Sequence, residues 1–236
     1  MNTVRFERGI AGAARATGTT IVIDTFRAFT TAAVLMDRGV DRIYLVDALD
    51  EARRLARSTG ALLCGEDGGR RPAGFDLSNS PVEAAQRADL VGSTIVQRTS
   101  AGTRSVVAAL RAGAAPVYAA SLVVASATST VAGFEPPVTI VAAGLHGTEP
   151  AEEDDLTAAF IADTIAGRRP DPLTADTIRS CDRAVTLAQA PWANPGDPGL
   201  AADLDRFAFA MRAHTTRKGP IELRRVDIRR DGEAGE

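Results

Sequence analysis

The stretch TIVIDTFRAFTTAAVLMDRG, residues 20–39, joins a short β-branched run directly to a longer helix-forming run. Residues 20–24 predict a strand, and residues 27–38 predict a helix that ends at Gly39. The alternation recurs, with strands expected at 42–46, 61–64, 94–97, 115–119 and 138–142 and helices at 49–58, 103–111, 122–131 and 152–166. Strands that alternate with helices predict an α/β protein with a mainly parallel sheet covered on both faces.

Outside this alternation lie a long loop and a C-terminal region. Residues 65–80 form a Gly-, Pro- and Asn-rich loop that is long for a compact domain, which favours a functional role. After Pro170 the pattern is helical, and residues 221–228 predict one or two closing strands. With 236 residues in total, we expect a single domain over 1–236.

Composition indicates an ordinary globular protein, with 45% apolar and 24% charged residues. The net charge of −3 provides no general basic surface, so we expect no nucleic-acid partner. Cys64 and Cys181 are too few for a disulfide framework and lack the spacing of a zinc site. The charged N-terminal segment lacks a signal-peptide pattern, so we expect a cytoplasmic protein. A homodimer is expected only from the general frequency of symmetric dimers.

One run without charged residues, 112–134, is long enough to raise the question of a membrane span. Small residues (Ala, Ser, Thr and Gly) dominate this run, and Pro116 interrupts it. We therefore expect a buried strand followed by a helix of small residues, in a protein that does not enter the membrane.

Four expected strands end in polar or glycine-rich segments, at residues 24–27, 65–69, 98–103 and 143–147. Ligands of α/β sheets bind beyond the carboxyl ends of the strands, so these segments predict one shared site. Glycine permits close backbone approach, and successive amides can then bind an anion. Thr103, after Gly102 at an expected helix start, suits phosphate, because free N–H groups and the helix dipole favour negative charge there.

Acidic residues gather at the same strand ends. Asp24, Glu66 and carboxylates of the run 152–155 would converge there, and crowded carboxylates repel one another unless a proton or cation intervenes. A hard divalent cation with oxygen ligands, typically Mg²⁺, fits this set. Arg27 and Arg98 lie beside these carboxylates in the sequence and could bind an acid group bidentately.

Each feature also has a purely structural interpretation. Asp24 could cap the following helix, and the acidic run could complement a helix dipole. Ser80 and Glu83 have the spacing of a helical capping box. His146, in a loop flanked by glycines, is a candidate general acid or base. The shared position at one sheet edge favours a functional site over these alternatives.

Longer motifs carry a resemblance to a known family. They are VIDTFRAFTT at 22–31, CGEDGG at 64–69, GFDLSNSP at 74–81 and TSAGT at 99–103, followed by Ala143-Gly144 and Glu153-Asp154. In this order and spacing they resemble the 2-phosphosulfolactate phosphatase family, also called ComB-like. The resemblance is strongest over residues 18–165, and GFDLSNSP is its most specific part.

The resemblance implies a three-layer α/β/α fold with a mainly parallel or mixed sheet. It also implies Mg²⁺ dependence and hydrolysis of 2-phosphosulfolactate to sulfolactate and phosphate on the route to coenzyme M. By position, the catalytic residues would be Asp24, Arg27 and Glu66. The acids expected to bind the metal are Asp24, Glu66, Glu153 and Asp154. The residues expected to contact the small anionic substrate are Arg27, Asn79, Ser80, Arg98, Thr99, Ser100, Gly102 and Thr103.

Two positions depart from the family pattern. Asp67 stands where the family usually has Arg, and Ala101 stands where it usually has Asn. Both changes remove a group that could bind an anion, and Arg70 and Arg71 are candidates to compensate. The substrate could therefore be a different small phosphorylated acid, or the chain could bind an anionic metabolite without catalysis.

The expected mechanism is metal-assisted transfer of the phosphoryl group to water. Arg27 and the amides of residues 100–103 would stabilise charge on the transferred group. Attack by Asp24 itself, forming an aspartyl phosphate, is the alternative. Phosphatases of the haloacid dehalogenase type that use such an Asp carry a second Asp two residues later, where this chain has Phe26. This difference favours water as the nucleophile.

Overall fold

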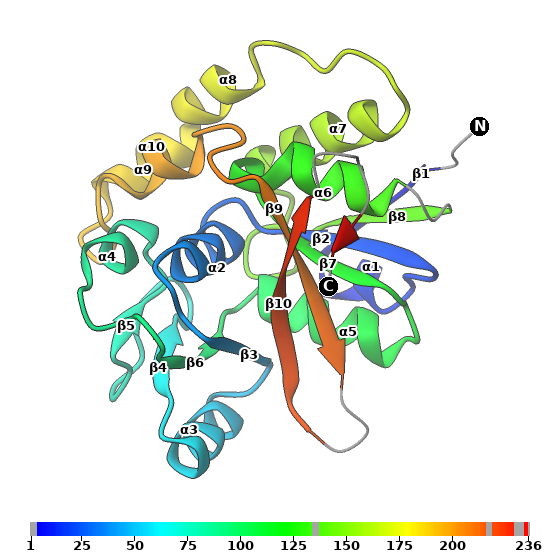
Figure 1. Ribbon diagram of the computed structural model, residues 1–236. Coiled ribbons are helices and arrows are strands. Elements are labelled where there is room, and N and C mark those ends of the chain that lie inside the picture. Colours follow the sequence, from blue (N-terminus) through cyan, green and yellow to red (C-terminus); the bar gives the residue numbers. More distant parts are fainter. Residues whose placement is uncertain (1–3, 134–136, 216–218, 229–233, 236) are drawn as a thin grey trace.

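The computed structural model describes residues 4–133, 137–215, 219–228 and 234–235. These residues form one curled sheet of 11 strands with helices on both faces (Figure 1). The strands are β1 (Val4–Arg8), β2 (Thr19–Ile23), β3 (Arg42–Val46), β4 (Leu62–Gly65), β5 (Leu77–Ser78), β6 (Thr94–Arg98), β7 (Val117–Ala120), β8 (Val138–Ala142), β9 (Phe209–Thr215), β10 (Ile221–Ile228) and β11 (Ala234–Gly235). The α-helices are α1 (Gly9–Ala13), α2 (Ala28–Asp37), α3 (Leu49–Thr59), α4 (Pro81–Gln86), α5 (Gly102–Arg111), α6 (Ala125–Ala132), α7 (Glu152–Ile165), α8 (Thr174–Ser180), α9 (Asp182–Gln189) and α10 (Asp197–Ala201).

Two parallel halves of the sheet are joined by an antiparallel pair of strands. Strands β1, β8, β2 and β7 pair in parallel, as do β3, β6, β4 and β5. Between them lie β9 and β10, with β9 antiparallel to β7 and β10 antiparallel to β3. The predicted α/β/α class with a mainly parallel or mixed sheet is confirmed, and the sheet is mixed.

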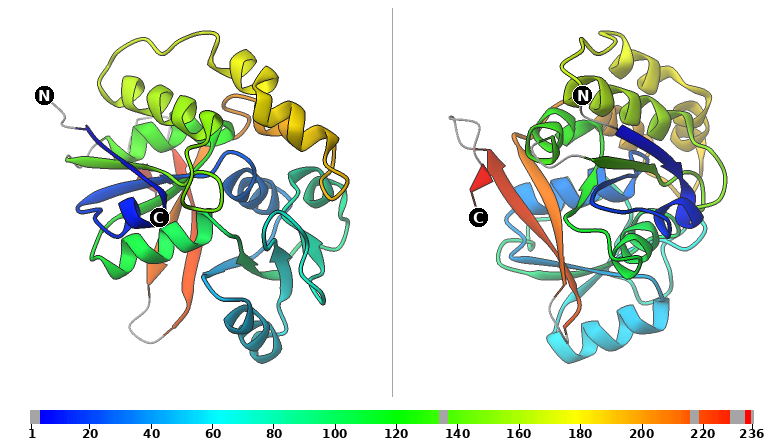
Figure 2. Two further views of the ribbon diagram at one scale, coloured as in Figure 1. Left: turned by 180° about the vertical axis from the view of Figure 1, so that it is seen from behind. Right: turned by 90° about the vertical axis from the view of Figure 1, so that its right-hand side faces the viewer.

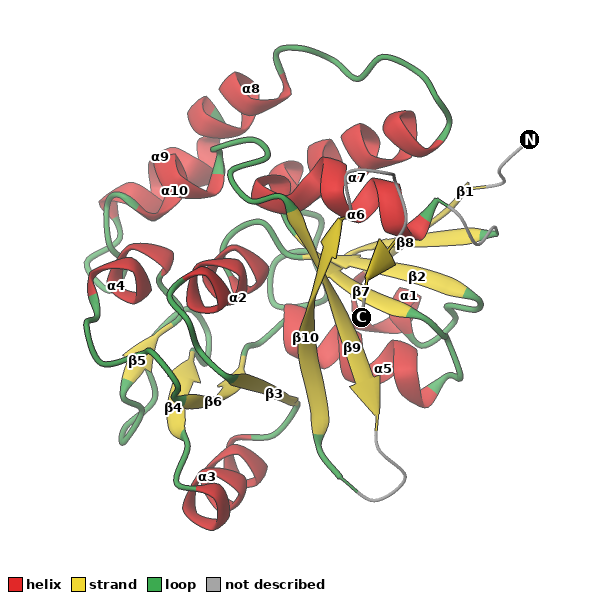
Figure 3. Ribbon diagram, viewed as in Figure 1, coloured by secondary structure: helices red, strands yellow, loops and turns green. Residues whose placement is uncertain are grey.

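The two parallel halves run in opposite directions, because three successive antiparallel pairings separate β7 from β3. In a flat sheet their carboxyl ends would lie at opposite edges. Here β9 and β10 cross steeply between the halves (Figure 3), and the curled sheet brings both sets of carboxyl ends together. The amide of Gly102, after β6, lies 2.9 Å from the carboxylate of Asp24, after β2. Curling of a mixed sheet, rather than a common strand direction, makes the strand ends converge.

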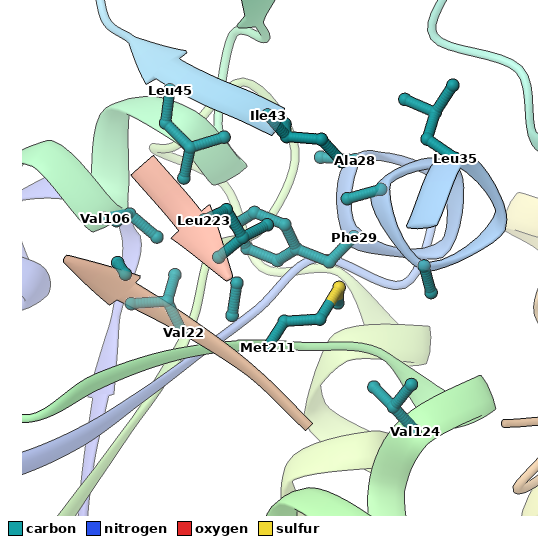
Figure 4. Packing of buried hydrophobic residues seen from close by; sticks show 14 of the residues in the cluster. Val22, Ala28, Phe29, Leu35, Ile43, Leu45, Val106, Val124, Met211 and Leu223 are labelled. Atoms are coloured by element: carbon teal, nitrogen blue, oxygen red, sulfur yellow. The ribbon is translucent and has the colours of Figure 1, made fainter. Parts of the chain in front are cut away.

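Helices α2 and α5 fill the space between the two halves. Phe29 of α2 and Val106 of α5 pack with Val22 of β2, Met211 of β9 and Leu223 of β10 (Figure 4). Burying one such side chain contributes about 1.5–3 kcal/mol. Because this cluster contacts both halves, the side chains that stabilise the fold also determine how the strand ends meet.

Other helices cover the outer faces of the sheet. Ile21 and Ile23, which alternate with Val22 along β2, pack with residues of α6 and α7. In the other half, Val46 and Val96 pack with residues of α3. The sheet is therefore covered by a layer of helices on each face.

Helices α8, α9 and α10 form a row along one side of the molecule, from α7 to α4 (Figures 1 and 2). The helical pattern expected after Pro170 is confirmed by this row. The row contacts α7 at one end and α4 at the other, so it spans the side on which the strand ends of both halves meet.

The sequence prediction missed strands β1, β5, β9 and β11 and helix α1, and it placed one helix start differently. Strand β1 was not predicted, because its residues are mostly polar and its Phe6 is exposed at the sheet edge. Strand β9 is rich in helix-forming Ala, Met and Arg, but its position at the centre of the sheet outweighs that propensity. The helix expected at 122–131 begins as a 3₁₀ turn, Leu122–Val124, before α6.

The charge-free run 112–134 forms β7 and then α6 over its described residues, as predicted. Both elements are largely buried within the fold. Across the described part of the chain, no helix is both long and apolar enough to cross a membrane.

Candidate active site

A pocket of about 150 Å³ lies at the junction of the two parallel halves. Three acidic side chains line it: Asp24 after β2, Glu66 after β4 and Glu153 in the first turn of α7. The remaining lining residues are Phe26, Arg27, Gly68, Gly69, Asn79, Ser100, Ala101, Gly144, Leu145, His146, Arg183, Leu187 and Trp192. The structure thus brings six of the predicted site residues to one pocket, namely Asp24, Arg27, Glu66, Asn79, Ser100 and Glu153.

Asp24 connects the two halves of the sheet at the pocket. Its Oδ1 accepts a hydrogen bond from the Ala28 amide at 3.0 Å, in the first turn of α2. Its Oδ2 accepts from the Gly102 amide at 2.9 Å, at the start of α5. Asp24 therefore holds two helix starts together while it lines the pocket, so the structural and functional interpretations of this residue are compatible.

Glu66 is held by the loops that follow β4 and β6. Its Oε2 accepts from the Gly69 amide at 2.6 Å and from the Ser100 hydroxyl at 3.0 Å. Its Oε1 accepts from the Ser100 amide. The expected long loop thus folds back on its own strand end and fixes a carboxylate at the pocket wall.

The neighbours Glu153 and Asp154 have different environments. Asp154 does not line the pocket; its Oδ1 accepts from the Thr25 amide at 2.7 Å and its Oδ2 from the Gly144 amide at 2.9 Å. It braces the ends of β2 and β8 against each other. Glu153 does line the pocket, and its buried Oε2 has no hydrogen-bond partner in the part of the chain described.

Burial and mutual repulsion shift the pKa values of these acids. Burial raises the pKa of Asp24 to about 6, opposed by its amide hydrogen bonds and increased by the charge of Glu66. Burial raises the pKa of Glu153 to about 7, and Asp24 adds to the shift while Arg183 opposes it. Burial also raises the pKa of Asp154 well above the ordinary range, with Asp24 and Glu153 adding to the shift. The acids at this junction therefore destabilise one another as anions.

Arg27 is the predicted substrate residue with the most constrained side chain. Its Nη1 donates to Asp197 at 2.9 Å in an ion pair of which both partners are buried. Its Nη2 donates to the Gly69 carbonyl at 3.1 Å, and its guanidinium lies 5.3 Å from the centroid of the Trp192 ring. Arg27 is thus preorganised on the pocket wall and keeps further N–H donors for a ligand.

Arg98 lies outside the pocket lining and already has three acceptors. Its Nη1 donates to Asp67 at 2.7 Å and to the Glu66 carbonyl at 2.8 Å, and its Nε donates to the Asp47 carbonyl at 3.3 Å. Asp67, one of the two departures from the family pattern, therefore neutralises Arg98 rather than facing a ligand. Arg70 and Arg71, the proposed compensating residues, are also outside the lining.

The loop 99–103 is held by bonds within itself and to the acids. The Thr99 amide donates to the Thr103 hydroxyl at 2.8 Å, and the Thr103 amide donates to the Thr99 hydroxyl at 3.1 Å. The amides of Ser100 and Gly102, which were expected to face an anion, donate to the carboxylates of Glu66 and Asp24. The loop thus positions the acids in this structure.

Asn79 and Ser80 also differ in their environment. Asn79 lines the pocket, and its buried Oδ1 lacks a hydrogen-bond partner among the described residues. Ser80 Oγ accepts from the Glu83 amide at 3.1 Å and donates to Asp197 at 2.6 Å, outside the lining. The predicted N-cap at Ser80 is confirmed. The Glu83 carboxylate, which in a capping box would accept from the Ser80 amide, instead accepts from the Ser78 amide at 3.0 Å.

Four residues of the C-terminal helical row contribute to the site and were not predicted. Arg183 and Leu187 of α9 line the pocket, together with Trp192. Asp197, at the start of α10, is fully buried against Arg27 and Ser80. Trp192 begins a Pro- and Gly-rich segment, residues 192–199, and a composition typical of a connector or a lid loop is the local sequence signal for this part of the site.

The pocket acids suit a hard divalent cation by their chemistry. Asp24, Glu66 and Glu153 offer oxygen donors, and the unpartnered Oε2 of Glu153 has capacity for a ligand. Within the described ranges, however, no three side chains of His, Cys, Asp or Glu are grouped closely enough to hold a metal ion. Holding one would therefore require these three carboxylates to approach one another.

We expect the metal-free protein to lose stability as the pH rises from about 4 to about 7. The pKa values of Asp24 and Glu153 rise on folding from 3.8 and 4.5 to about 6 and about 7. Both carboxyl groups bind protons more tightly in the folded protein than in the unfolded chain. Their contribution to stability is therefore largest below the pKa values of the unfolded chain, and it is lost as the pH rises through the pKa values of the folded protein. The loss should be on the order of a few kcal/mol.

Urea unfolding in EDTA at about pH 5 and about pH 8 checks this expectation. The variant Glu153→Gln should show a smaller difference between the two pH values than the unaltered protein. An unfolding free energy that is equal or higher at the upper pH would contradict the expected charge repulsion.

Comparisons with known proteins show the family to which the chain belongs. A family model described as 2-phosphosulpholactate phosphatase matches residues 8–202, a span that includes every residue lining the pocket. A Deinococcus radiodurans protein named probable 2-phosphosulfolactate phosphatase is 31% identical over 229 residues, covering 88% of this chain and 89% of the relative.

Two further relatives carry the same name. The Thermus thermophilus protein is 38% identical over 146 residues, and the Thermotoga petrophila protein is 33% identical over 143 residues. These matches cover 61% of this chain and only 60% and 61% of the two relatives. Since the family model spans both halves of the sheet and the helical row beside them, the chain belongs to the 2-phosphosulfolactate phosphatase family.

Proposed function

We propose that this chain is a Mg²⁺-dependent phosphatase that hydrolyses the phosphate ester of a small anionic 2-hydroxy acid, with 2-phosphosulfolactate as its substrate. The observation that carries the proposal is one small pocket in which the carboxylates of Asp24, Glu66 and Glu153 lie with the guanidinium groups of Arg27 and Arg183. Carboxylates suit a divalent cation, and guanidinium groups suit the acid groups of a substrate. The family match and the names of the relatives support the reaction class and the substrate.

Asp24, Glu66 and Glu153 would hold the cation, which when bound supplies Lewis-acid polarisation of a phosphate oxygen. Arg27, oriented by Asp197 and Gly69, would bind the phosphate through its remaining N–H donors. Its preorganisation means that little reorganisation is needed when charge develops on the transferred group. The side-chain amide of Asn79 would orient the substrate at the same wall.

Water is the nucleophile that the site supports better. Both oxygens of Asp24 accept backbone N–H bonds, from Ala28 and Gly102. Such bonds occupy lone pairs on both oxygens and fix the carboxylate between two helix starts, which disfavours its own attack on a phosphate. The site also has His146 on its lining, which could exchange a proton with a water molecule or with the leaving group.

We further propose a cytoplasmic protein that acts on the route to coenzyme M. Cys64 and Cys181 are both buried free thiols, and unpaired cysteines are typical of proteins in reducing compartments. The products would be sulfolactate and inorganic phosphate, as the relatives' names suggest for those proteins.

Phosphate release from 2-phosphosulfolactate should require added Mg²⁺ and stop in EDTA. We expect at least about a 100-fold difference in rate, because the cation supplies several kcal/mol of transition-state stabilisation. 2-Phospholactate, which lacks the sulfonate, is the comparison substrate. The measurement is continuous detection of inorganic phosphate, with Mg²⁺ restored after EDTA as the reversibility control.

Two outcomes would alter the proposal. Equal or faster release from 2-phospholactate would keep the phosphatase and replace the substrate. No release from either ester, by a folded protein that still binds inorganic phosphate, would instead indicate a non-catalytic protein that binds an anionic metabolite.

A further inference from the structure

We propose that Arg183 recognises the second acid group of the substrate, a carboxylate or sulfonate that the carbon skeleton carries besides the phosphate. This assignment rests on the proposed phosphatase function and adds a determinant of substrate selectivity to it. The determinant lies in α9, within the helical row that follows the two sheet halves.

The Arg183 side chain has unused hydrogen-bonding capacity at the pocket. It lines the pocket and is 27% exposed, yet its Nε is buried and has no hydrogen-bond partner in the described part of the chain. A buried N–H group without a partner is costly, so native structures rarely leave one empty without a functional reason. If the guanidinium turns toward an acid group bound in the pocket, that group provides the missing acceptor.

The nearest acidic side chain does not supply that acceptor. Glu153 Oε1 lies 3.9 Å from Arg183 Nε, which is beyond hydrogen-bond distance. Glu153 Oε2 is buried and also without a partner among the described residues. If Glu153 turns toward a cation, as the proposed function requires, Arg183 loses this weak interaction and an anionic ligand remains as its partner.

The other two arginines of the predicted site already have hydrogen-bond partners in the protein. Arg27 donates to Asp197 and to Gly69, which fixes its guanidinium on a different part of the wall, against Trp192. Arg98 donates to Asp67 and to backbone carbonyls outside the pocket. Two arginines therefore line the pocket in distinct settings, Arg27 with fixed partners and Arg183 with a free donor.

A free guanidinium donor provides discrimination as well as affinity. A site that hydrogen-bonds a substrate group rejects an analogue lacking that group, because the buried donor is then left unpaired. The planar fork of Arg matches the oxygens of a carboxylate or sulfonate better than the ammonium of Lys does. Arg183 would thus make the enzyme selective for phosphorylated acids over simple phosphate monoesters.

The test compares the unaltered protein with Arg183→Met on three phosphoesters in the presence of Mg²⁺. These are 2-phosphosulfolactate, 2-phospholactate and ethyl phosphate, which carry two, one and no additional acid groups. We expect kcat/KM for 2-phosphosulfolactate to fall about 10- to 100-fold, mainly through KM, and kcat/KM for ethyl phosphate to change less than about twofold. Arg183→Lys should give an intermediate loss.

The pattern of losses decides the assignment. A loss on 2-phosphosulfolactate alone assigns Arg183 to the sulfonate, and a loss on 2-phospholactate as well assigns it to the carboxylate. Equal losses on all three esters, or no loss on any, overturn the proposal. Arg168→Met is the matched control, because Arg168 is 63% exposed and pairs with Asp163 away from the pocket.

Binding of sulfolactate, measured by calorimetry, separates this proposal from the proposed function. Arg183→Met should bind sulfolactate about tenfold more weakly than the unaltered protein does. Its unfolding midpoint should be close to that of the unaltered protein. Equal binding by both would overturn the assignment even if hydrolysis is observed. Arg183-dependent binding by a protein that hydrolyses none of the esters would support the assignment and count against the phosphatase.

Discussion

Asp24→Asn should lower kcat/KM for phosphate release at least about 1,000-fold, since the lost charge is worth several kcal/mol in the transition state. Asn has the shape of Asp but lacks its negative charge, so the proposed cation loses a ligand at the junction of the sheet halves. The NH₂ group of Asn would also face the N–H of either Ala28 or Gly102, where a carboxylate oxygen of Asp24 now accepts a hydrogen bond. Single-turnover phosphate release with saturating Mg²⁺ is the measurement.

The same substitution should leave the fold largely intact. Burial raises the pKa of Asp24 to about 6. Above that pH the buried negative charge lowers the stability of the unaltered protein, and the neutral Asn side chain removes this cost. That gain is on the order of 3 kcal/mol. The unpaired amide hydrogen bond opposes it by about 1–3 kcal/mol. In EDTA at about pH 8 the unfolding midpoint should therefore stay within a few degrees of the unaltered protein.

Asp155→Asn is the matched control for Asp24→Asn. Asp155 belongs to the same acidic run as Glu153, but its carboxylate is 35% exposed and pairs with Arg8 at 3.0 Å. The control should keep activity within about twofold, as expected for an exposed ion pair. Substantial phosphatase activity in Asp24→Asn would contradict the assigned role of Asp24 in cation binding and catalysis.

Asp197→Ala should lower the free energy of unfolding by about 3–5 kcal/mol, because it leaves the buried Arg27 charge without its partner. For a chain of this length that corresponds to a fall of about 6–20 °C in Tm. The Ser80 hydroxyl and the Val82 amide, which donate to the same carboxylate, lose their acceptor as well. Thermal unfolding followed by circular dichroism is the measurement.

Two further variants test the cause of that loss. Asp203→Ala removes a carboxylate from the same region, but Asp203 is 49% exposed and pairs with Arg206, so Tm should hardly change. In Arg27→Met/Asp197→Leu both charges are gone, and stability should recover part of what Asp197→Ala loses. A double variant that is less stable than Asp197→Ala would contradict the unpaired-charge explanation.

The fold and part of the site could be predicted because the signals are local. Asp24 and Glu66 each follow a strand directly, and Ser80 is marked as a cap by the Pro and Glu after it. Such patterns depend on chain neighbours and on the general rule for strand ends. The alternation of strands and helices predicted the layers for the same reason.

The roles within the site could not be predicted, because they depend on contacts between distant residues. Nothing around Asp67 indicates that it pairs with Arg98, and nothing around Arg183 indicates that it reaches the pocket. Adjacent positions 153 and 154 both carry acids, yet helix geometry turns one toward the pocket and the other toward the amides of Thr25 and Gly144. Strand β9 was missed because burial at the sheet centre outweighs local propensity.

The central position of β9 and β10 sets the order in which the protein can assemble during synthesis. Strands β3 and β7 are translated before β9 and β10, so the edge of each that later pairs with them stays unpaired until residues 209–228 leave the ribosome. Unpaired strand edges invite association with other chains, and pairing over such long sequence separations is slow. The nascent chain thus depends on its last strands to protect the first ones, and chaperone demand should be highest just before they emerge.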